Sequence, residues 1–283
     1  MTRSADISPL SVLLSRVDAV ADGLASRDTV PCGFPSVDKM LGGGFRRGDL
    51  VALGGDVGSG KSALALAFAI RASQQDRRVA FLTAEMTIER VLERIIAIEA
   101  RARIDDLRQG TLDDETRSAA GIVALRLRER LPILECVPAC GSSQIGDLLD
   151  ELPEVDVVVI DSIAGLAQGA RPMSEEHAAM IRDLKALALA RDVVVLATAP
   201  LPELSSRPDR RPTLDDFGAL GAVKQHADVV LTLFRQDMYE PARDIEGATE
   251  LLVRKNRNGP TGYVDLFFYA QWMRFEDMLD PDR

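Results

Sequence analysis

Residues 55–62 read G-D-V-G-S-G-K-S, and this stretch decides the fold. It matches the pattern G-x-x-x-x-G-K-[ST], in which glycines let successive backbone N–H groups turn inward around a phosphate. Lys61 adds a positive charge near the β- and γ-phosphates of a nucleotide, and the Ser62 hydroxyl can be a ligand of Mg²⁺. The phosphate-binding residues that we predict are Gly55, Gly58, Ser59, Gly60, Lys61 and Ser62.

The residues on both sides of this stretch have the pattern that the motif requires. Residues 49–53 (D-L-V-A-L) are typical of a short buried strand, and residues 63–70 (A-L-A-L-A-F-A-I) of a helix that is buried all round. The loop then lies at a helix N-terminus, where the helix dipole favours a bound phosphate. A glycine-rich turn that binds nothing is the alternative, and the Lys-Ser pair with these flanks argues against it.

Composition narrows the class of protein. The chain has 283 residues, of which 46% are apolar and 28% charged, and its formal net charge is −10. This charge argues against a broad basic surface for nucleic acid but leaves a local basic track open. Cys32, Cys136 and Cys140 are too scattered for a disulfide framework or a zinc site. Without an apolar signal core or a membrane-length apolar run, we expect a cytoplasmic protein with no membrane partner.

Strands and helices alternate along most of the chain. This alternation runs through Ala199, and strands then follow one another, which predicts an α/β core with an antiparallel β extension at the C-terminal end. Residues 104–111 are expected to form a polar connection. The expected strands are 49–53, 78–82, 133–137, 155–161, 192–197, 227–234, 250–254 and 263–269, and further helices are expected from Thr87, over 112–130, from Ser142 or Ser143, and from Ser174.

The N-terminal segment has an apolar seam with heptad spacing. Leu10, Leu13, Val17, Val20 and Leu24 lie on one stripe, which predicts an amphipathic helix. The helix either folds onto its own domain or docks on a neighbouring subunit, and these residues alone leave both interpretations open.

Two carboxylates are candidate partners of the phosphate-binding loop. Glu85 follows the strand 78–82 and Asp161 ends the strand 155–161, so both are expected at the edge of the sheet where ligands bind. Glu85 can orient and deprotonate a water aimed at the γ-phosphate, while Asp161, with Ser62, can hold the Mg²⁺. The alternative for Glu85 is an acid that only complements a helix dipole.

A basic strand end and turn, R-K-N-R-N-G-P at residues 254–260, is the second candidate element of catalysis. A guanidinium from Arg257, with Lys255 beside it, can stabilise charge on a transferring phosphoryl group across an interface. A solvated basic turn is the alternative.

Taken together, these residues resemble the RecA-like motor domain of the DnaB family of hexameric replicative helicases. The resemblance covers residues 10–275. The motifs that carry it are G-F-P-S-V-D-K-M-L, the phosphate-binding loop, T-A-E-M, L-R-Q-G-T-L-D-D-E, V-V-V-I-D, K-Q-H-A-D-V-V, R-K-N-R-N-G-P and Q-W-M-R-F.

The resemblance implies a linker-type helix and loop over residues 1–30 and a RecA-like P-loop ATPase domain over residues 31–283. It implies ATP and Mg²⁺ as cofactors, and a homo-oligomeric ring, a hexamer, on single-stranded DNA in replication. Glu85 would be the hydrolytic base, Asp161 the Walker B acid, and Lys255 and Arg257 a finger pair that acts on the neighbour's nucleotide.

The chain departs from the family pattern in three respects. The sequence begins near the family's linker helix, so we expect no N-terminal helical domain, and we expect Ala199 where the family has a glutamine that senses the γ-phosphate. In the central-channel loop, Gly218 and Ala219 replace an arginine and a glutamate, so one contact to the DNA backbone is missing. Two functions therefore stay open: a helicase motor, or a RecA-like regulatory ATPase whose nucleotide state controls partner assembly without unwinding. A RadA-like repair protein is disfavoured because the cysteines of its zinc module are missing.

Overall fold

The fold is built on one large mixed β-sheet. It is seen in a computed structural model that describes residues 8–22, 28–202, 204, 207–240 and 245–278. The strand order is β11-β10-β9-β8-β3-β7-β6-β4-β5, and a separate short pair joins β1 to β2. The strands are β1 Thr29–Val30, β2 Phe45–Arg46, β3 Leu50–Gly55, β4 Val79–Thr83, β5 Ile133–Cys136, β6 Val157–Asp161, β7 Val194–Pro200, β8 Val229–Phe234, β9 Ala248–Asn256, β10 Gly262–Tyr269 and β11 Arg274–Asp277.

The sheet is parallel in its core and antiparallel at one end. Strand β3 pairs in parallel with β7 and β8, and β6, β4 and β5 continue this parallel part. Strands β8, β9, β10 and β11 pair antiparallel. The predicted α/β fold with an antiparallel C-terminal extension is therefore confirmed.

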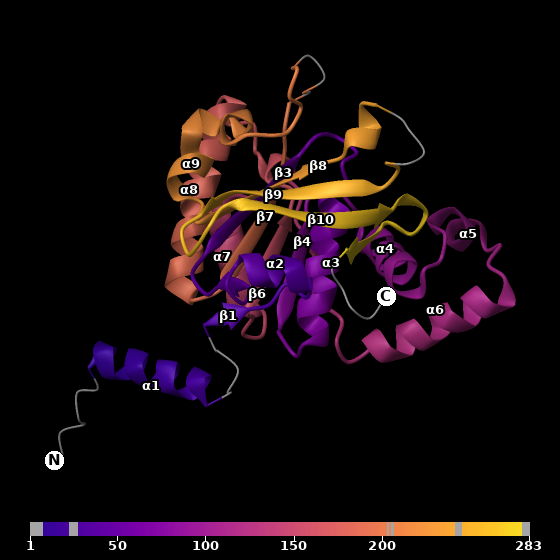
Figure 1. The fold of residues 1–283 in the computed structure, drawn as a ribbon, viewed down its shortest axis with the longest axis horizontal. Helices are drawn as coiled ribbons and strands as arrows, with labels where there is room; N and C mark the ends of the chain where they lie inside the picture. Colours follow the sequence, from indigo (N-terminus) through magenta and orange to yellow (C-terminus); the bar gives the residue numbers. More distant parts are fainter. Residues whose placement is uncertain (1–7, 23–27, 203, 205–206, 241–244, 279–283) are drawn as a thin grey trace.

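Helices cover both faces of the sheet (Figure 1). Alternate residues of β3 enter different cores: Val51 and Leu53 pack with α2, α3, α4 and α6, whereas Leu50 and Ala52 pack with α7, α8 and α9. The P-loop strand is therefore buried on both sides. The helices are α1 Pro9–Ala21, α2 Pro35–Met40, α3 Lys61–Gln74, α4 Ile88–Ala100, α5 Ile104–Gln109, α6 Asp114–Leu127, α7 Ser142–Glu151, α8 Met173–Arg191 and α9 Ala222–His226.

Some local predictions were wrong. The expected polar connection contains helix α5, with Asp105 and Asp106 in its first turn, where the dipole favours acids. Thr87 does cap α4, since its side chain accepts a hydrogen bond from the Arg90 N–H. Helix α8 instead has Pro172 as its N-cap residue, so Ser174 lies inside the helix. Likewise Gly141, and neither Ser142 nor Ser143, is the N-cap residue of α7.

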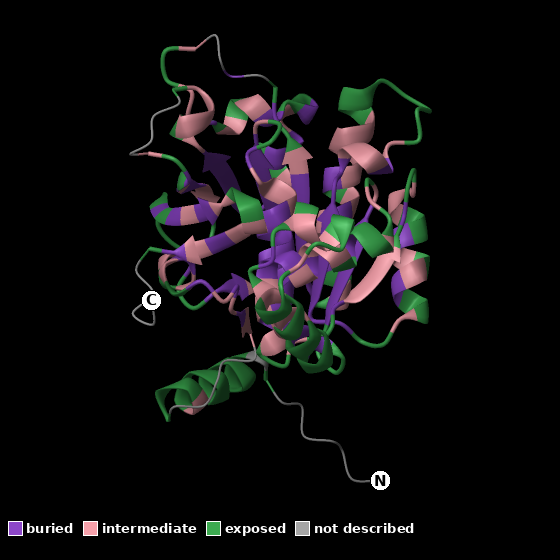
Figure 2. Ribbon diagram, turned by 90° about the vertical axis from the view of Figure 1, so that its right-hand side faces the viewer, coloured by how far each residue is buried: buried purple, intermediate pink, exposed green. Residues whose placement is uncertain are grey.

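Helix α1 stands apart from the folded body (Figures 1 and 2). Its apolar seam faces solvent: Leu10 is 63% exposed, Leu13 54% and Val17 56%. The interpretation in which this seam packs onto its own domain is therefore wrong for the described part of the helix; Leu24 lies outside the described residues. The domain division at residue 30 stays a prediction.

Candidate nucleotide site

The P-loop joins the end of β3 to the start of α3, and two of its glycines have conformations that other residues rarely adopt. Gly58 has φ +81°, and Gly60, the N-cap residue of α3, has φ +100°. A Cβ on Gly60 would also lie 2.9 Å from the ring of Phe275. Glycine is needed at both positions for the loop to wrap at the helix N-terminus.

Lys61 lies inside this wrap. Its Nζ donates hydrogen bonds to the carbonyl oxygens of Gly55 at 2.9 Å and Asp56 at 2.8 Å. Burial lowers the pKa of the ammonium, and the nearby carboxylates of Asp161, Asp56 and Glu85 oppose this effect. The structure thus places a cation where the loop's N–H groups and the helix dipole already favour an anion.

Asp161 ends strand β6 and is 1% exposed. Its Oδ1 accepts hydrogen bonds from Ser62 Oγ at 3.0 Å and Thr198 Oγ1 at 2.6 Å. Its Oδ2 is buried and has no hydrogen-bond partner among the residues that the structure describes. Burial raises the pKa of this carboxyl, and the two hydroxyl donors oppose it.

These oxygens fit the requirements of Mg²⁺. The ion prefers hard oxygen ligands, and it usually takes one or two from protein and the rest from phosphates and water. Within the described ranges, no cluster of three or more His, Cys, Asp or Glu side chains could hold a metal by itself. The hydroxyl of Ser62 and the carboxylate of Asp161 would supply the protein ligands, and a nucleotide would supply the phosphate oxygens.

Glu85 follows β4 at the same edge of the sheet. The Thr83 hydroxyl oxygen accepts hydrogen bonds from the backbone N–H groups of Glu85 at 3.3 Å and Met86 at 3.0 Å, and this fixes the turn. The Glu85 carboxylate accepts a hydrogen bond from Ser162 Oγ, and the residue is exposed. A carboxylate held in this way can accept a proton from a water molecule.

One cavity of about 620 Å³ brings these groups together. Of the predicted residues, Gly58, Gly60, Lys61, Ser62, Glu85 and Asp161 line it, whereas Gly55 and Ser59 are buried and do not line it. Its size is that of an ordinary small-molecule site. The lining residues that the sequence did not indicate are Val57, Ala63, Arg94, Ser162, Thr198, Pro200, Arg235, Phe268, Ala270 and Met273.

Strand β7 changes one expectation about γ-phosphate sensing. Thr198 and Pro200 line the cavity, while Ala199 packs against the core on the other face of the sheet. The expectation that the Ala199 side chain faces the γ-phosphate is therefore wrong: alternate strand residues face opposite sides, and Pro200 faces the cavity instead. Neither Ala199 nor Pro200 has a side chain with a hydrogen-bond donor.

The basic hairpin lies at the opposite end of the sheet from this cavity. Asn256 pairs with Val229, which lies beside Val51 near the start of β3, whereas the P-loop follows the end of β3. Arg257 Nη1 donates to Asp228 Oδ1 at 2.9 Å, and Lys255 Nζ donates to the carbonyl oxygen of Lys224 at 2.6 Å. The structure therefore does not bring Lys255 and Arg257 to the P-loop of their own chain. They can reach a nucleotide only across an interface.

Two buried acids hold this hairpin. Asp228 accepts hydrogen bonds from Arg257 and, at 2.7 Å, from Lys185 Nζ. Asp49 Oδ2 accepts from Asn258 Nδ2 at 2.8 Å and from the Arg46 N–H at 3.3 Å. Burial, and then the charge of Asp228, raise the pKa of Asp49 to about 6.

Replacing Asp49 with asparagine is expected to stabilise the protein at pH 8. Because the folded-state pKa rises from 3.8 to about 6, the folded state binds more protons, and the free energy of unfolding falls as the pH rises through this window. The full shift in the pKa of Asp49 corresponds to a loss of at most about 3 kcal/mol in the free energy of unfolding. The amide oxygen can still accept both hydrogen bonds, which share one oxygen.

Urea unfolding at pH 4, 6 and 8 checks this expectation. Asp49→Asn should gain about 1–3 kcal/mol over the unmodified chain at pH 8, with little gain at pH 4. The control is Asp147→Asn on the exposed side of α7, which should follow the unmodified chain. If the free energy of unfolding changed with pH in the same way for Asp49→Asn and the unmodified chain, the raised pKa of Asp49 would be contradicted.

The loop that we predict to line a central channel has no cationic side chain at Gly218 or Ala219, the two positions that depart from the family pattern. Gly218, Ala219 and Leu220 have φ values of +54°, +45° and +52°. Leu220 is 68% exposed, while Asp216 is bound by Arg207 Nη1 at 2.7 Å. The tip of this loop is therefore apolar.

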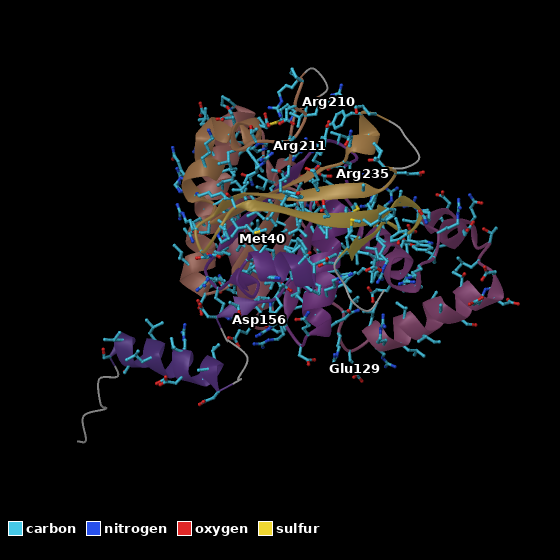
Figure 3. All side chains as sticks on the ribbon, viewed as in Figure 1. Met40, Glu129, Asp156, Arg210, Arg211 and Arg235 are labelled. Atoms are coloured by element: carbon cyan, nitrogen blue, oxygen red, sulfur yellow. The ribbon has the colours of Figure 1, made fainter. Side chains whose placement is uncertain are left out.

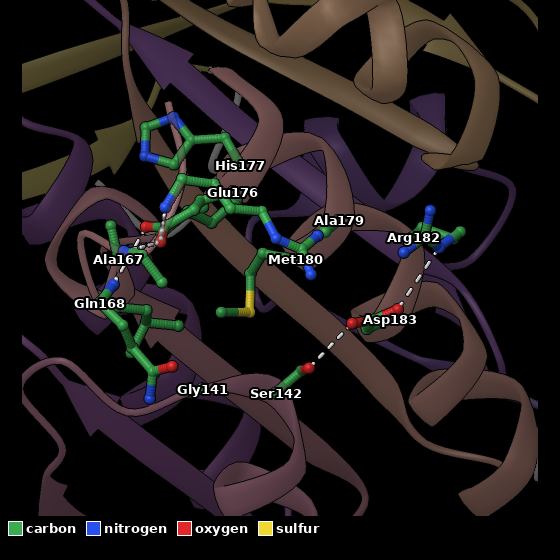
Figure 4. A pocket seen from close by; sticks show the side chains of 14 residues that line it. Gly141, Ser142, Ala167, Gln168, Glu176, His177, Ala179, Met180, Arg182 and Asp183 are labelled. Atoms are coloured by element: carbon green, nitrogen blue, oxygen red, sulfur yellow. Dashed lines mark hydrogen bonds and ion pairs between the residues drawn. The ribbon is translucent and has the colours of Figure 1, made fainter. Parts of the chain in front are cut away.

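A second cavity lies between α7, α8 and the segment after β6 (Figure 4). Glu176 organises its rim, because its carboxylate accepts hydrogen bonds from the backbone N–H groups of residues 168–171. Ser142 Oγ donates to Asp183 at 2.9 Å on the other side. None of the predicted site residues lines it.

Comparisons with known proteins agree with this arrangement. Residues 29–277 match the family described as DnaB-like helicase C terminal domain. The chain is 28% identical over 257 residues to the "Replicative DNA helicase DnaC" of Bacillus subtilis (strain 168), covering 88% of this chain and 56% of that protein. It is 30% identical over 278 residues to the "Replicative DNA helicase DnaB" of Leifsonia xyli, covering 95% and 60%. The chain thus spans little more than half the length of these relatives.

Solved structures share the fold. A solved structure described as an ATPase domain superposes with a TM-score of 0.85 at 23% identity, covering 97% of this chain and 99% of that chain. The structure described as "The Structure Of A DnaB-Like Replicative Helicase And Its Interactions With Primase" gives 0.83 at 24% identity, covering 98% and 68%. A KaiC-like protein from Pyrococcus horikoshii gives 0.60 at 18% identity, covering 88% and 98%. No helix among the described residues has the length and apolar character of a membrane span.

Proposed function

Because the chain belongs to the family of the DnaB-like helicase C terminal domain, we propose that it is an ATP-hydrolysing motor that moves on single-stranded DNA as a ring. One observation carries the proposal: Lys61, Ser62, Glu85 and Asp161 line a single cavity at the carboxyl edge of the sheet. A phosphate cradle, a ligand pair for Mg²⁺ and a carboxylate base are the parts that nucleotide hydrolysis requires.

In this proposal the loop and Lys61 bind the β- and γ-phosphates of ATP. Ser62 and Asp161 would hold Mg²⁺, whose charge offsets that of the phosphates. Glu85 orients a water molecule and takes its proton as the water oxygen bonds to the γ-phosphorus. The bond from phosphorus to the bridging oxygen breaks, and ADP leaves with that oxygen.

Two features support an assembly of several copies. The apolar seam of α1 is exposed, which favours docking on a neighbouring subunit, and the Arg257 hairpin lies far from its own P-loop. A ring satisfies both, since each nucleotide would lie between one copy's cavity and the next copy's hairpin. By analogy with the relatives, we propose a cytoplasmic hexamer that acts in DNA replication.

A forked-duplex assay tests the motor function. With ATP and Mg²⁺, the chain is expected to separate the strands, and single-stranded DNA should raise its ATPase rate several-fold. Lys61→Ala, which cannot hold the phosphates, is the matched negative control. An ATPase rate indifferent to single-stranded DNA, with no strand separation, would contradict the motor.

The second candidate is a regulatory ATPase whose nucleotide state controls assembly with a partner. The apolar tip at Leu220 and the donor-free Pro200 favour it, because both weaken the link between hydrolysis and DNA. Salt dependence separates the two functions. A motor that grips phosphates loses DNA affinity steeply as salt rises, with a slope of roughly 0.7 per phosphate contacted on a single strand.

A further inference from the structure

Asp228 is a buried acid immediately before β8, and it holds the side chain of Arg257. The residue is 5% exposed, and its two carboxylate oxygens have different partners. Oδ2 accepts hydrogen bonds from the Leu50 N–H at 2.8 Å and from Lys185 Nζ at 2.7 Å, whereas Oδ1 accepts one from Arg257 Nη1 at 2.9 Å. The first two donors therefore fix the carboxylate, and the fixed carboxylate orients the guanidinium.

The other contacts of Arg257 orient its side chain without burying it. Nη2 donates to the carbonyl oxygen of Gln225 at 2.6 Å, and the backbone N–H donates to the carbonyl oxygen of Asp228 at 2.9 Å. The Arg257 side chain is nevertheless 47% exposed. A guanidinium has five N–H donors in a fixed fork, so bonds to two acceptors leave donors for an anion from outside the chain.

Asp228 is too far from the nucleotide cavity of its own chain to act on it directly. It immediately precedes β8, whereas Arg235, which lines that cavity, immediately follows the strand (Figure 3). The strand has six residues, which corresponds to a separation of about 20 Å. An effect of Asp228 on hydrolysis is therefore expected to pass through the hairpin to the nucleotide of a neighbour.

We propose that Asp228 is a positioning residue for Arg257, and that its carboxylate holds the guanidinium in the orientation in which it meets the neighbour's transferring phosphoryl group. This rests on the proposed function, in which Arg257 acts across an interface. Lys185, Asp228 and Arg257 are two cations and one anion, so a positive charge remains for the phosphoryl group. Lys185 also offsets the charge of the buried carboxylate, which would be costly if unpaired.

Asp228→Asn tests the proposal through the different partners of the two oxygens. An amide has one oxygen, and we expect it to face the two donors from Leu50 and Lys185, so that the NH₂ group faces Arg257 and displaces it. Steady-state phosphate release should fall about 10- to 100-fold, the effect of misplacing a reacting group by about 1 Å. The dissociation constant of a non-hydrolysable ATP analogue should change less than about twofold.

A double variant separates positioning from a general structural role. Adding Asp228→Asn to Arg257→Ala should lower turnover no further, because Asp228 acts through Arg257, whereas a structural defect would multiply the two losses. The matched control is Asp49→Asn, at the other buried acid of the hairpin, which contacts Asn258 and should leave turnover unchanged. Mixing Asp228→Asn copies with Lys61→Ala copies, whose hairpins are intact, should restore part of the turnover.

Thermal melting verifies that each variant folds. If Asp228→Asn does not fold because Lys185 is left unpaired, the double variant Asp228→Asn, Lys185→Met removes the buried cation as well and takes its place. Normal or faster turnover by Asp228→Asn would overturn the proposal, as would multiplied losses with Arg257→Ala or an equal loss in Asp49→Asn.

Arg257→Ala, measured in the same assay, distinguishes the failure of this proposal from that of the proposed function. A loss in Arg257→Ala without a loss in Asp228→Asn contradicts the positioning role alone. Normal turnover by Arg257→Ala, or an unmodified chain without ATPase activity, contradicts the proposed function and the positioning role with it.

Discussion

Replacing Arg257 with alanine is expected to lower the rate of ATP turnover by about 10³-fold or more while ATP still binds. The P-loop, Lys61 and Asp161 belong to a different part of the molecule from the hairpin, so ground-state binding should persist. The loss arises because a guanidinium from the adjacent copy would no longer meet the charge that develops on the transferring phosphoryl group. Steady-state phosphate release, with nucleotide binding measured in parallel, checks both halves of the expectation.

A mixing experiment separates a contribution across an interface from a structural defect. Lys61→Ala copies are expected to lose ATP binding but carry an intact Arg257, and Arg257→Ala copies carry an intact cavity. Mixed rings should hydrolyse ATP faster than either variant does alone. Because Arg257 also contacts buried Asp228, melting of the variant must be recorded. Normal turnover by Arg257→Ala would show that the hairpin is only a solvated turn.

Glu85→Gln is expected to reduce turnover by about 10²–10⁴-fold, with nucleotide binding retained. Glutamine has nearly the same shape and can still accept the hydrogen bond from Ser162, but its amide cannot take a proton from water. Glu89→Gln, one turn later on the exposed side of α4, is the matched control and should turn over normally. If Glu85 only complements the helix dipole, its replacement would change stability by less than about 1 kcal/mol and leave the rate unchanged.

Local sequence patterns were sufficient to predict the P-loop and the central strands of the sheet. The glycine spacing of the P-loop and the apolar runs of β6 and β7 encode their own structure, because each depends on neighbours in sequence. The buried positions of Asp161 and of strand β3 follow from the same patterns. Helix α5 was missed because its single turn and a half shows too little apolar periodicity.

The sequence could not predict that residues from the antiparallel extension line the nucleotide cavity. Phe268 and Met273 come from the antiparallel extension, and only the strand order β10-β9-β8-β3 brings them beside the P-loop. The error at Ala199 has a different cause. Strand β7 runs to Pro200, beyond the expected end at residue 197, and a shift of one position in a strand exchanges the two faces. Arg94 gave no local signal, since an arginine on an amphipathic helix is ordinarily solvated.

The exposed seam of α1 implies that assembly of the protein, and with it nucleotide turnover, depends on protein concentration. Burying a leucine or valine contributes about 1.5–3 kcal/mol, and on a single copy this contribution is not realised. If another copy covers the seam, the docking of α1 depends on protein concentration. Each tenfold dilution then makes the free energy of association less favourable by about 1.4 kcal/mol. Nucleotide turnover would then disappear on dilution before any chain unfolds.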